Sequence, residues 1–164
     1  MTPRRLHAFI KIILLLLVAF PSYVFANGQY DVYEKSSGKS LEEILEDAEF
    51  AITEQNFRIV DRLHIGQTIR SRGKPDFPDF EIIMYCSLTF AEKILELDPV
   101  MINACPGRIT VRENGKQHII AAPLWPEQND NIELNKTMHD MNDLVRKIVD
   151  YAAAEWLETN PKQH

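Results

Sequence analysis

The alternation of apolar and polar residues predicts strands and helices along the chain after residue 29. Side chains that alternate with a period of two lie on opposite faces of a strand, and such runs occur at residues 30–35, 57–65, 79–86, 108–113 and 116–122. Apolar residues at three- and four-residue spacing indicate amphipathic helices at residues 41–54, 90–97 and 133–158. The closely spaced strands and separate helices predict an α+β fold, with an antiparallel sheet of about five strands and helices on one face.

Two local signals fix positions within these elements. Ser40 and Glu43 have the spacing of a capping box, so a helix should begin at residue 41. The pair Asn114-Gly115 lies between two alternating runs, which is typical of a two-residue hairpin turn. If both residues form the turn, Val111 faces His118 on the neighbouring strand.

The first 26 residues differ from the rest of the chain. Basic, apolar and small residues follow one another there, in the ranges 4–11, 12–20 and 24–26. This order is that of a secretory signal peptide, and the apolar run is shorter than the roughly 20 residues that span a bilayer. We therefore expect cleavage after Ala26, export to the periplasm or the cell exterior, and one mature domain of residues 27–164. No Cys follows Ala26, so a lipoprotein is not expected; a retained membrane anchor is the alternative.

Charge narrows the classes of partner. The chain has 18 Lys and Arg against 24 Asp and Glu, and removal of residues 1–26 leaves 15 basic residues and a net charge of −9. Such a balance disfavours nucleic acids and anionic membrane surfaces as partners. The sequence contains no Ser-His-Asp order, Gly-rich phosphate loop or paired-carboxylate signature. It therefore predicts non-enzymatic binding of a small ligand or a partner protein, without a cofactor.

Asp61 is a weaker candidate for chemistry. Unbroken alternation through residues 57–65 places its carboxylate on the same face as Ile59 and Leu63, where burial would raise its pKa for acid–base work. Residues of this kind more often lie at a sheet edge or contact an Arg, and that is the outcome we expect for Asp61.

An ordered set of short motifs occupies the segment from Phe80 to Pro126. A Cys closes a strand, a short helix ends in Asp-Pro, and a Pro and an Arg begin a strand before a Gly-containing hairpin; the motifs are Tyr85–Leu88, Ala91–Leu95, Leu97–Pro99, Cys105–Val111 and Asn114–Lys116. This set resembles the domain-of-unknown-function 302 family. The resemblance implies a fold similar to the TATA-binding-protein-like class, β-α-β(4)-α, and often a homodimer, but no settled activity. In the commoner family pattern a Cys lies between the Pro and the Arg, where this chain has Gly107.

Cys86 and Cys105 are the only cysteines of the chain. If the strands at 79–86 and 108–113 are antiparallel neighbours, both cysteines lie at the same end of the sheet, within reach of a bond. An oxidising compartment then predicts an intramolecular disulfide, with Cys86 facing the covered side of the sheet. A pair of inert buried thiols and a redox-active or sulfur-handling pair are the alternatives.

The sequence offers further candidates for ligand contacts and metal ligands. The candidate ligand contacts are Tyr85, Arg108, His118 and Trp125. Trp125 lies between Pro123 and Pro126, and we expect it to cover the core rather than to bind a ligand. The dipeptide Cys105-Pro106 and the run Met138–Met141 leave haem or copper binding as a further alternative. Met138 and Met141 belong to the apolar stripe of the last helix, and no His pair has metal-ligand spacing, so we expect no metal site.

Overall fold

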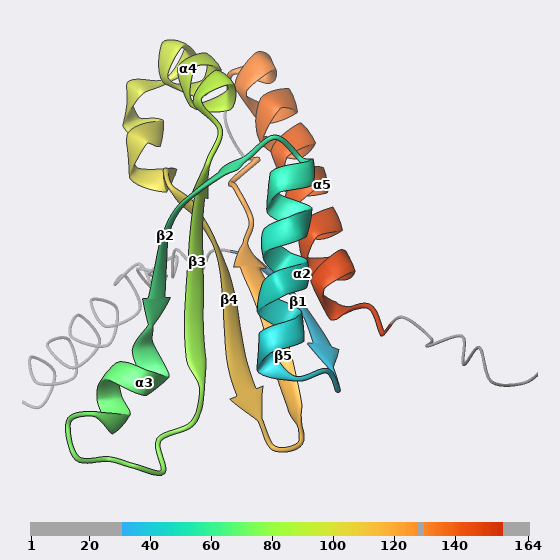
Figure 1. Ribbon diagram of the computed structural model, residues 1–164. Helices are drawn as coiled ribbons and strands as arrows, with labels where there is room; N and C mark the ends of the chain where they lie inside the picture. Colours follow the sequence, from blue (N-terminus) through green and yellow to red (C-terminus); the bar gives the residue numbers. More distant parts are fainter. Residues whose placement is uncertain (1–30, 128–129, 156–164) are drawn as a thin grey trace, which may run out of the picture.

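A computed structural model describes residues 31–127 and 130–155, and it contains one five-stranded antiparallel sheet (Figure 1). The strands are β1 (Val32–Ser37), β2 (Arg58–His64), β3 (Phe80–Cys86), β4 (Gly107–Asn114) and β5 (Gln117–Pro123), in the order β1-β5-β4-β3-β2. The helices are α2 (Leu41–Glu54), α3 (Ile65–Arg70), α4 (Leu88–Leu97), the 3-10 helix η1 (Pro99–Ala104) and α5 (Ile132–Ala153). The predicted α+β class, the antiparallel sheet and the β-α-β(4)-α order of the main elements are confirmed.

Two predicted features concern residues that the structure does not describe. The predicted signal peptide, residues 1–26, lies outside the described residues, as does Trp156 at the end of the predicted last helix. Among the described helices, none combines the length and the apolar character that crossing a membrane requires.

Helices α2 and α5 lie side by side over one face of the sheet (Figure 1). Their capping explains where they begin: Ser40 and Glu43 form the predicted capping box of α2, and the Asn131 side chain accepts from the amides of Glu133 and Leu134 at the start of α5. The apolar stripes of both helices meet the sheet in a core whose fully buried members include Ile44, Ile52, Ile83, Ile109, Ile120, Val145 and Ile148.

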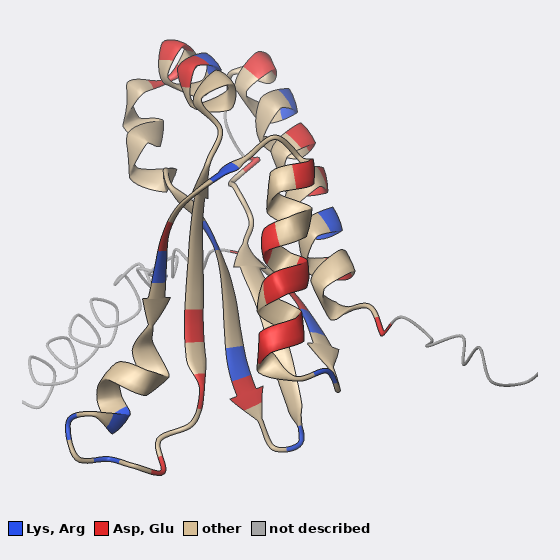
Figure 2. Cartoon of the chain, viewed as in Figure 1, with Lys and Arg blue, Asp and Glu red and all other residues tan. Residues whose placement is uncertain are grey.

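The acidic excess is carried largely by the helical layer. Helix α2 contains six Asp and Glu residues and no Lys or Arg, and Figure 2 shows them as red bands along the helix. The opposite face of the sheet carries Arg58, Arg108 and Arg112, one on β2 and two on β4. The negative charge of the protein is therefore unevenly distributed between the two layers.

The β4–β5 hairpin has a different register from the one predicted. Asn114 remains in the strand opposite Gln117, and the turn is formed by Gly115 and Lys116. Only Gly115 has a positive φ, 66°, which is the pattern of a type II′ turn with Gly in the first central position. Val111 therefore faces Ile120 instead of His118. The shift is two residues, so each side chain stays on its predicted face.

A β-bulge in β2 overturns the predicted face of Asp61. Ile59 lies opposite Tyr85, whereas Asp61 lies opposite Met84, so Val60 is the extra residue. An extra residue reverses the alternation beyond it. Asp61 consequently lies on the open face of the sheet, exposed, and does not share a face with Ile59.

Candidate functional site

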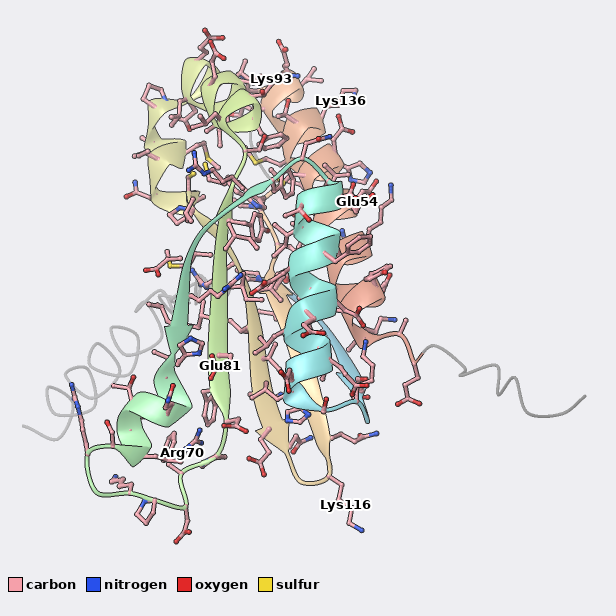
Figure 3. All side chains as sticks on the ribbon, viewed as in Figure 1. Glu54, Arg70, Glu81, Lys93, Lys116 and Lys136 are labelled. Carbon is pink, nitrogen blue, oxygen red and sulfur yellow. The ribbon has the colours of Figure 1, made fainter. Side chains whose placement is uncertain are left out.

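Five of the six predicted site residues meet at one end of the sheet, beside α4 and η1. Tyr85 and Cys86 end β3, Cys105 directly follows η1, Arg108 lies near the start of β4, and Trp125 follows β5. Antiparallel pairing of β3 with β4 brings the end of one strand to the start of the other. Lys93 on α4 and Lys116 at the hairpin tip mark the two opposite ends of the molecule in Figure 3.

His118 does not join the other five residues. It lies opposite Glu113 near the hairpin, where its Nδ1 is 3.2 Å from the backbone oxygen of Lys39. The structure therefore separates His118 from the cysteine end by most of the length of β5.

The two cysteines lie in contact. Their Sγ atoms are 3.5 Å apart, and both residues are half-buried. Burial, followed by the nearby Cys86 thiol, raises the pKa of Cys105 to about 11, so its nucleophilic thiolate form is scarce at neutral pH. Both sulfurs are therefore placed for bond formation with each other, while Cys105 is poorly suited to attack another molecule.

Cys86 faces the side of the sheet opposite to the predicted one. The buried positions of β3 are Glu81, Ile83 and Tyr85, which face α2 and α5. Cys86 shares the other face with Ile82 and Met84. The alternation along β3 was predicted correctly, but the prediction that Cys86 faces the covered side was wrong.

Tyr85 and Gly107 form a tight contact beneath the cysteine pair. The Tyr85 ring is 2% exposed and stacks on Phe57 with 5.3 Å between ring centroids. A Cβ on Gly107 would lie 2.6 Å from Cζ of this ring. The Tyr85 ring thus occupies the space that a side chain at position 107 would need, which explains why Gly stands there. Burial also raises the pKa of Tyr85, which keeps its hydroxyl protonated.

We expect Gly107→Ala to lower the free energy of unfolding by about 1–3 kcal/mol, because the added methyl overpacks a filled site. Urea denaturation followed by circular dichroism measures this loss. Gly73→Ala is a control for a glycine in open space, where only the positive φ of 94° opposes the substitution. A Gly107→Ala protein as stable as the wild type would show that the Tyr85 ring moves aside freely.

Two neighbouring cavities adjoin the cysteine pair. The first, about 80 Å³, opens between the end of η1 and the segment after β5, and its lining includes Asn103, Ala104, Pro106, Arg108, Leu124 and Trp125. The second is a narrow space of about 10 Å³ whose lining includes Cys86, Cys105, Tyr85 and Phe90. Gly107 and Trp125 line both cavities. The first cavity is therefore the candidate ligand site, and the cysteines lie just behind its wall.

Arg108 is the charged residue in the lining of the first cavity. Within residues 31–127 and 130–155, no carboxylate lies within ion-pair distance of its guanidinium, although ten ion pairs form elsewhere. An Arg without an acidic partner keeps its five donors available for an anionic group. The cavity thus combines apolar side chains with the polar Asn103 and one cation.

The run Met138–Met141 does not assemble a copper site. Met138 and Met141 are 0% and 3% exposed in the core, whereas the His139 side chain is more than half exposed and contacts Glu127. Their side chains lie on different sides of α5. No group of three or more His, Cys, Asp or Glu with metal-binding geometry occurs among the described residues.

Two buried polar residues, Glu81 and Asn142, were not among the predicted site residues. Glu81 is 6% exposed, and its carboxylate lies 2.6 Å from Nδ1 of the half-exposed His64. Figure 3 shows Glu81 on β3, away from the cysteine end. Asn142, 1% exposed, lies within the apolar stripe of α5 and contacts the segment that carries Trp125. The alternation of β3 already placed Glu81 beside Ile83 and Tyr85, whereas nothing local indicates the partner of Asn142.

Comparisons with known proteins agree with the fold and the ordered motifs. The chain is similar to an uncharacterized conserved DUF302 protein from Bacillus stearothermophilus of known crystal structure, with a TM-score of 0.67 and 14% identity over 75% of this chain and 98% of that chain. At this identity the likeness shows the fold alone. No curated protein matches the chain. The sequence pattern of the family described as Domain of unknown function DUF302 matches residues 33–153. The chain therefore belongs to the DUF302 family.

Proposed function

We propose that the protein is an exported, non-enzymatic binding module whose ligand occupies the cavity beside η1. The observation that carries this proposal is the lining of that cavity, which joins the apolar side chains of Pro106, Leu124 and Trp125 with the polar Asn103 and with Arg108 as the single cation. Concave, mostly apolar sites with a few placed polar groups are typical of small-molecule binding. Export rests on the N-terminal sequence pattern, since residues 1–26 lie outside the described part of the chain.

The size and charge of the cavity limit the ligand. A volume of about 80 Å³ is small beside the roughly 300–1,000 Å³ of sites for drug-sized molecules. It admits a small molecule, or one end of a larger one, and is small for a haem. Arg108 favours a carboxylate or another planar anion, which a guanidinium can contact with two hydrogen bonds.

Thiol chemistry is the second candidate function, because the Sγ atoms of Cys86 and Cys105 are 3.5 Å apart. Catalysis of thiol exchange needs an accessible thiolate with a lowered pKa. The raised pKa of Cys105 is opposite to that requirement. We therefore favour binding as the function and a supporting role for the cysteine pair.

Native mass spectrometry of protein purified from the envelope fraction of its own host tests both parts of the proposal. We expect a chain that begins at Asn27, together with a bound small molecule that is released on denaturation. In Arg108→Gln the bound fraction should fall about tenfold or more, because a charge-assisted hydrogen bond contributes about 1.5–3 kcal/mol.

Arg112→Gln is the matched control, because Arg112 lies two residues further along β4, outside the cavity lining, and its guanidinium is 3.6 Å from the carboxylate of Glu34. It should leave the bound fraction unchanged. A wild-type chain with no bound mass would refute the binding role, and a mature chain that still begins at Met1 would refute export.

A further inference from the structure

The segment after β5 forms a wall of the cavity, yet it has left the sheet. The last β1–β5 pair joins Val32 and Pro123, and the amide of Leu124 still donates to the backbone oxygen of Asp31 at 2.7 Å. Trp125 comes next in the chain and is 8% exposed. Its backbone amide and carbonyl therefore need partners that no neighbouring strand supplies.

Asn142 supplies both partners. The Trp125 amide donates to Oδ1 of Asn142 at 2.7 Å, and Nδ2 of Asn142 donates to the Trp125 carbonyl oxygen at 3.0 Å. One primary amide thus makes the same two contacts that a paired strand would make. This arrangement fixes the Trp125 backbone against α5 at the place where sheet pairing ends.

The remaining proton of the Asn142 amide extends the contact to a third residue. Nδ2 also donates to Oε1 of Glu127 at 2.7 Å, and Oε2 of Glu127 lies 3.1 Å from Nδ1 of His139. Asn142 therefore contacts the segment at two positions, Trp125 and Glu127. The indole itself packs edge-on to Phe90, with 6.1 Å between ring centroids.

The position of Asn142 in α5 makes these contacts unusual. Its neighbours on the buried stripe include Met138, Met141 and Val145, which are 0%, 3% and 0% exposed. Burial of an amide among apolar side chains is costly unless its hydrogen-bonding groups are satisfied. A helix that only needed to pack on the sheet would be served by an apolar residue here, so the amide must be explained by the segment that it holds.

We propose that Asn142 is the positioning residue of the cavity, which holds Trp125 in the wall through paired hydrogen bonds to its backbone. The inference rests on the proposed binding role for its functional meaning, whereas the positioning itself can be tested without any ligand. Without Asn142, the Trp125 backbone loses its hydrogen bonds to α5, and the contact between Glu127 and His139 remains as a link between the segment and this helix. The indole then becomes accessible to solvent.

The test uses Asn142→Leu in a Trp156→Phe background, in which Trp125 is the only tryptophan. Leucine suits the apolar stripe of α5, so the helix retains its packing, while two buried backbone groups of Trp125 lose their partners. Each such loss shifts the balance toward the open segment by about tenfold. We expect the quenching of Trp125 fluorescence by acrylamide to rise severalfold and its emission to move to longer wavelength.

A second readout is the titration of Glu127 by NMR. The hydrogen bond from Asn142, followed by contacts with His139, lowers the pKa of Glu127 below its usual 4.5. This interaction therefore stabilises the fold above pH 4.5 and is lost as the pH falls through the lower folded-state value. In Asn142→Leu the pKa of Glu127 should return toward 4.5, a change that a loss of core packing alone would not produce.

Thr137→Val is the matched control. Thr137 is 2% exposed on the same helix, and its hydroxyl donates only within α5, to the backbone oxygen of Glu133 at 2.8 Å. It should change neither Trp125 quenching nor the titration of Glu127. A folded Asn142→Leu protein with wild-type quenching would overturn the proposal.

Hydrogen exchange of the wild type keeps the inference testable if Asn142→Leu does not fold. The side-chain amide protons of Asn142 should exchange far more slowly than those of exposed asparagines, and equally fast exchange would overturn the proposal. A protein in which Asn142→Leu exposes Trp125, but which carries no bound small molecule in native mass spectra, would refute the binding role and leave the positioning role intact.

Discussion

In protein taken from the envelope of its host, Cys86 and Cys105 are expected to form an intramolecular disulfide that raises the free energy of unfolding by about 3 kcal/mol relative to the reduced protein. The Sγ atoms lie 3.5 Å apart at one end of adjacent antiparallel strands, so only a small movement brings them to bonding distance. The bond would close the loop that contains α4 and η1, and the stabilisation follows from the entropy that the unfolded chain loses.

Thiol titration of the unfolded, unreduced protein measures the bond directly, and no free thiol per chain is expected. Cys86→Ala should then lower the free energy of unfolding by about 2–5 kcal/mol under oxidising conditions. In the presence of reductant, the difference between this variant and the wild type should shrink to the small cost of a lost thiol contact. Two free thiols in freshly isolated protein would contradict the prediction, and a disulfide-linked dimer would point to intermolecular pairing.

The reduction potential of the pair separates the two candidate functions. A structural disulfide in an exported protein has a potential below about −300 mV, whereas a labile or catalytic one lies higher. We expect the lower value, because the Cys105 thiol has a raised pKa and both cysteines are half-buried behind the wall of the cavity. A higher value would favour thiol chemistry as the function.

Strand β3 shows what alternation reveals about this fold and what it leaves open. The pattern correctly separated Phe80, Ile82, Met84 and Cys86 from Glu81, Ile83 and Tyr85. The set with Cys86 was expected on the covered side of the sheet, whereas the set with Glu81 lies there. Glu81 is tolerated under the helical layer because His64 hydrogen-bonds to it from β2. A hydrogen-bond partner on the neighbouring strand cannot be recognised from the alternation within one strand.

In the candidate site, the proximity of the two cysteines was predictable from the sequence. Antiparallel neighbours bring Cys86 and Cys105 together, so the topology alone was enough to place them. The cavity wall was not predictable, because it depends on Asn142 contacting the backbone of a residue 17 positions earlier. The bulge at Val60 was also invisible, since the apolar residues before and after it still alternate. Local sequence patterns were therefore sufficient to predict the helices and strands, whereas the cavity wall depends on contacts between segments far apart in the sequence.

Trp125→Ala is expected to lower the free energy of unfolding by about 3–5 kcal/mol, the usual cost of removing a large buried aromatic side chain. The indole is 8% exposed, contacts Phe90 edge-on and lines both cavities. Its removal would join the two spaces into one cavity that reaches the cysteine pair. Urea denaturation measures the loss, and circular dichroism checks that the sheet and helices remain.

Trp125→Phe separates packing from ligand contact at this position. Phenylalanine keeps an aromatic ring against Phe90 and fills much of the space, so it should recover more than half of the stability lost in Trp125→Ala. If the indole only seals the wall, Trp125→Phe also retains the bound small molecule in native mass spectra. If it contacts the ligand, the bound fraction falls although the protein is stable. A loss below about 1 kcal/mol in Trp125→Ala would instead mean that the segment after β5 is not packed on the core, and the cavity would then lack a fixed wall.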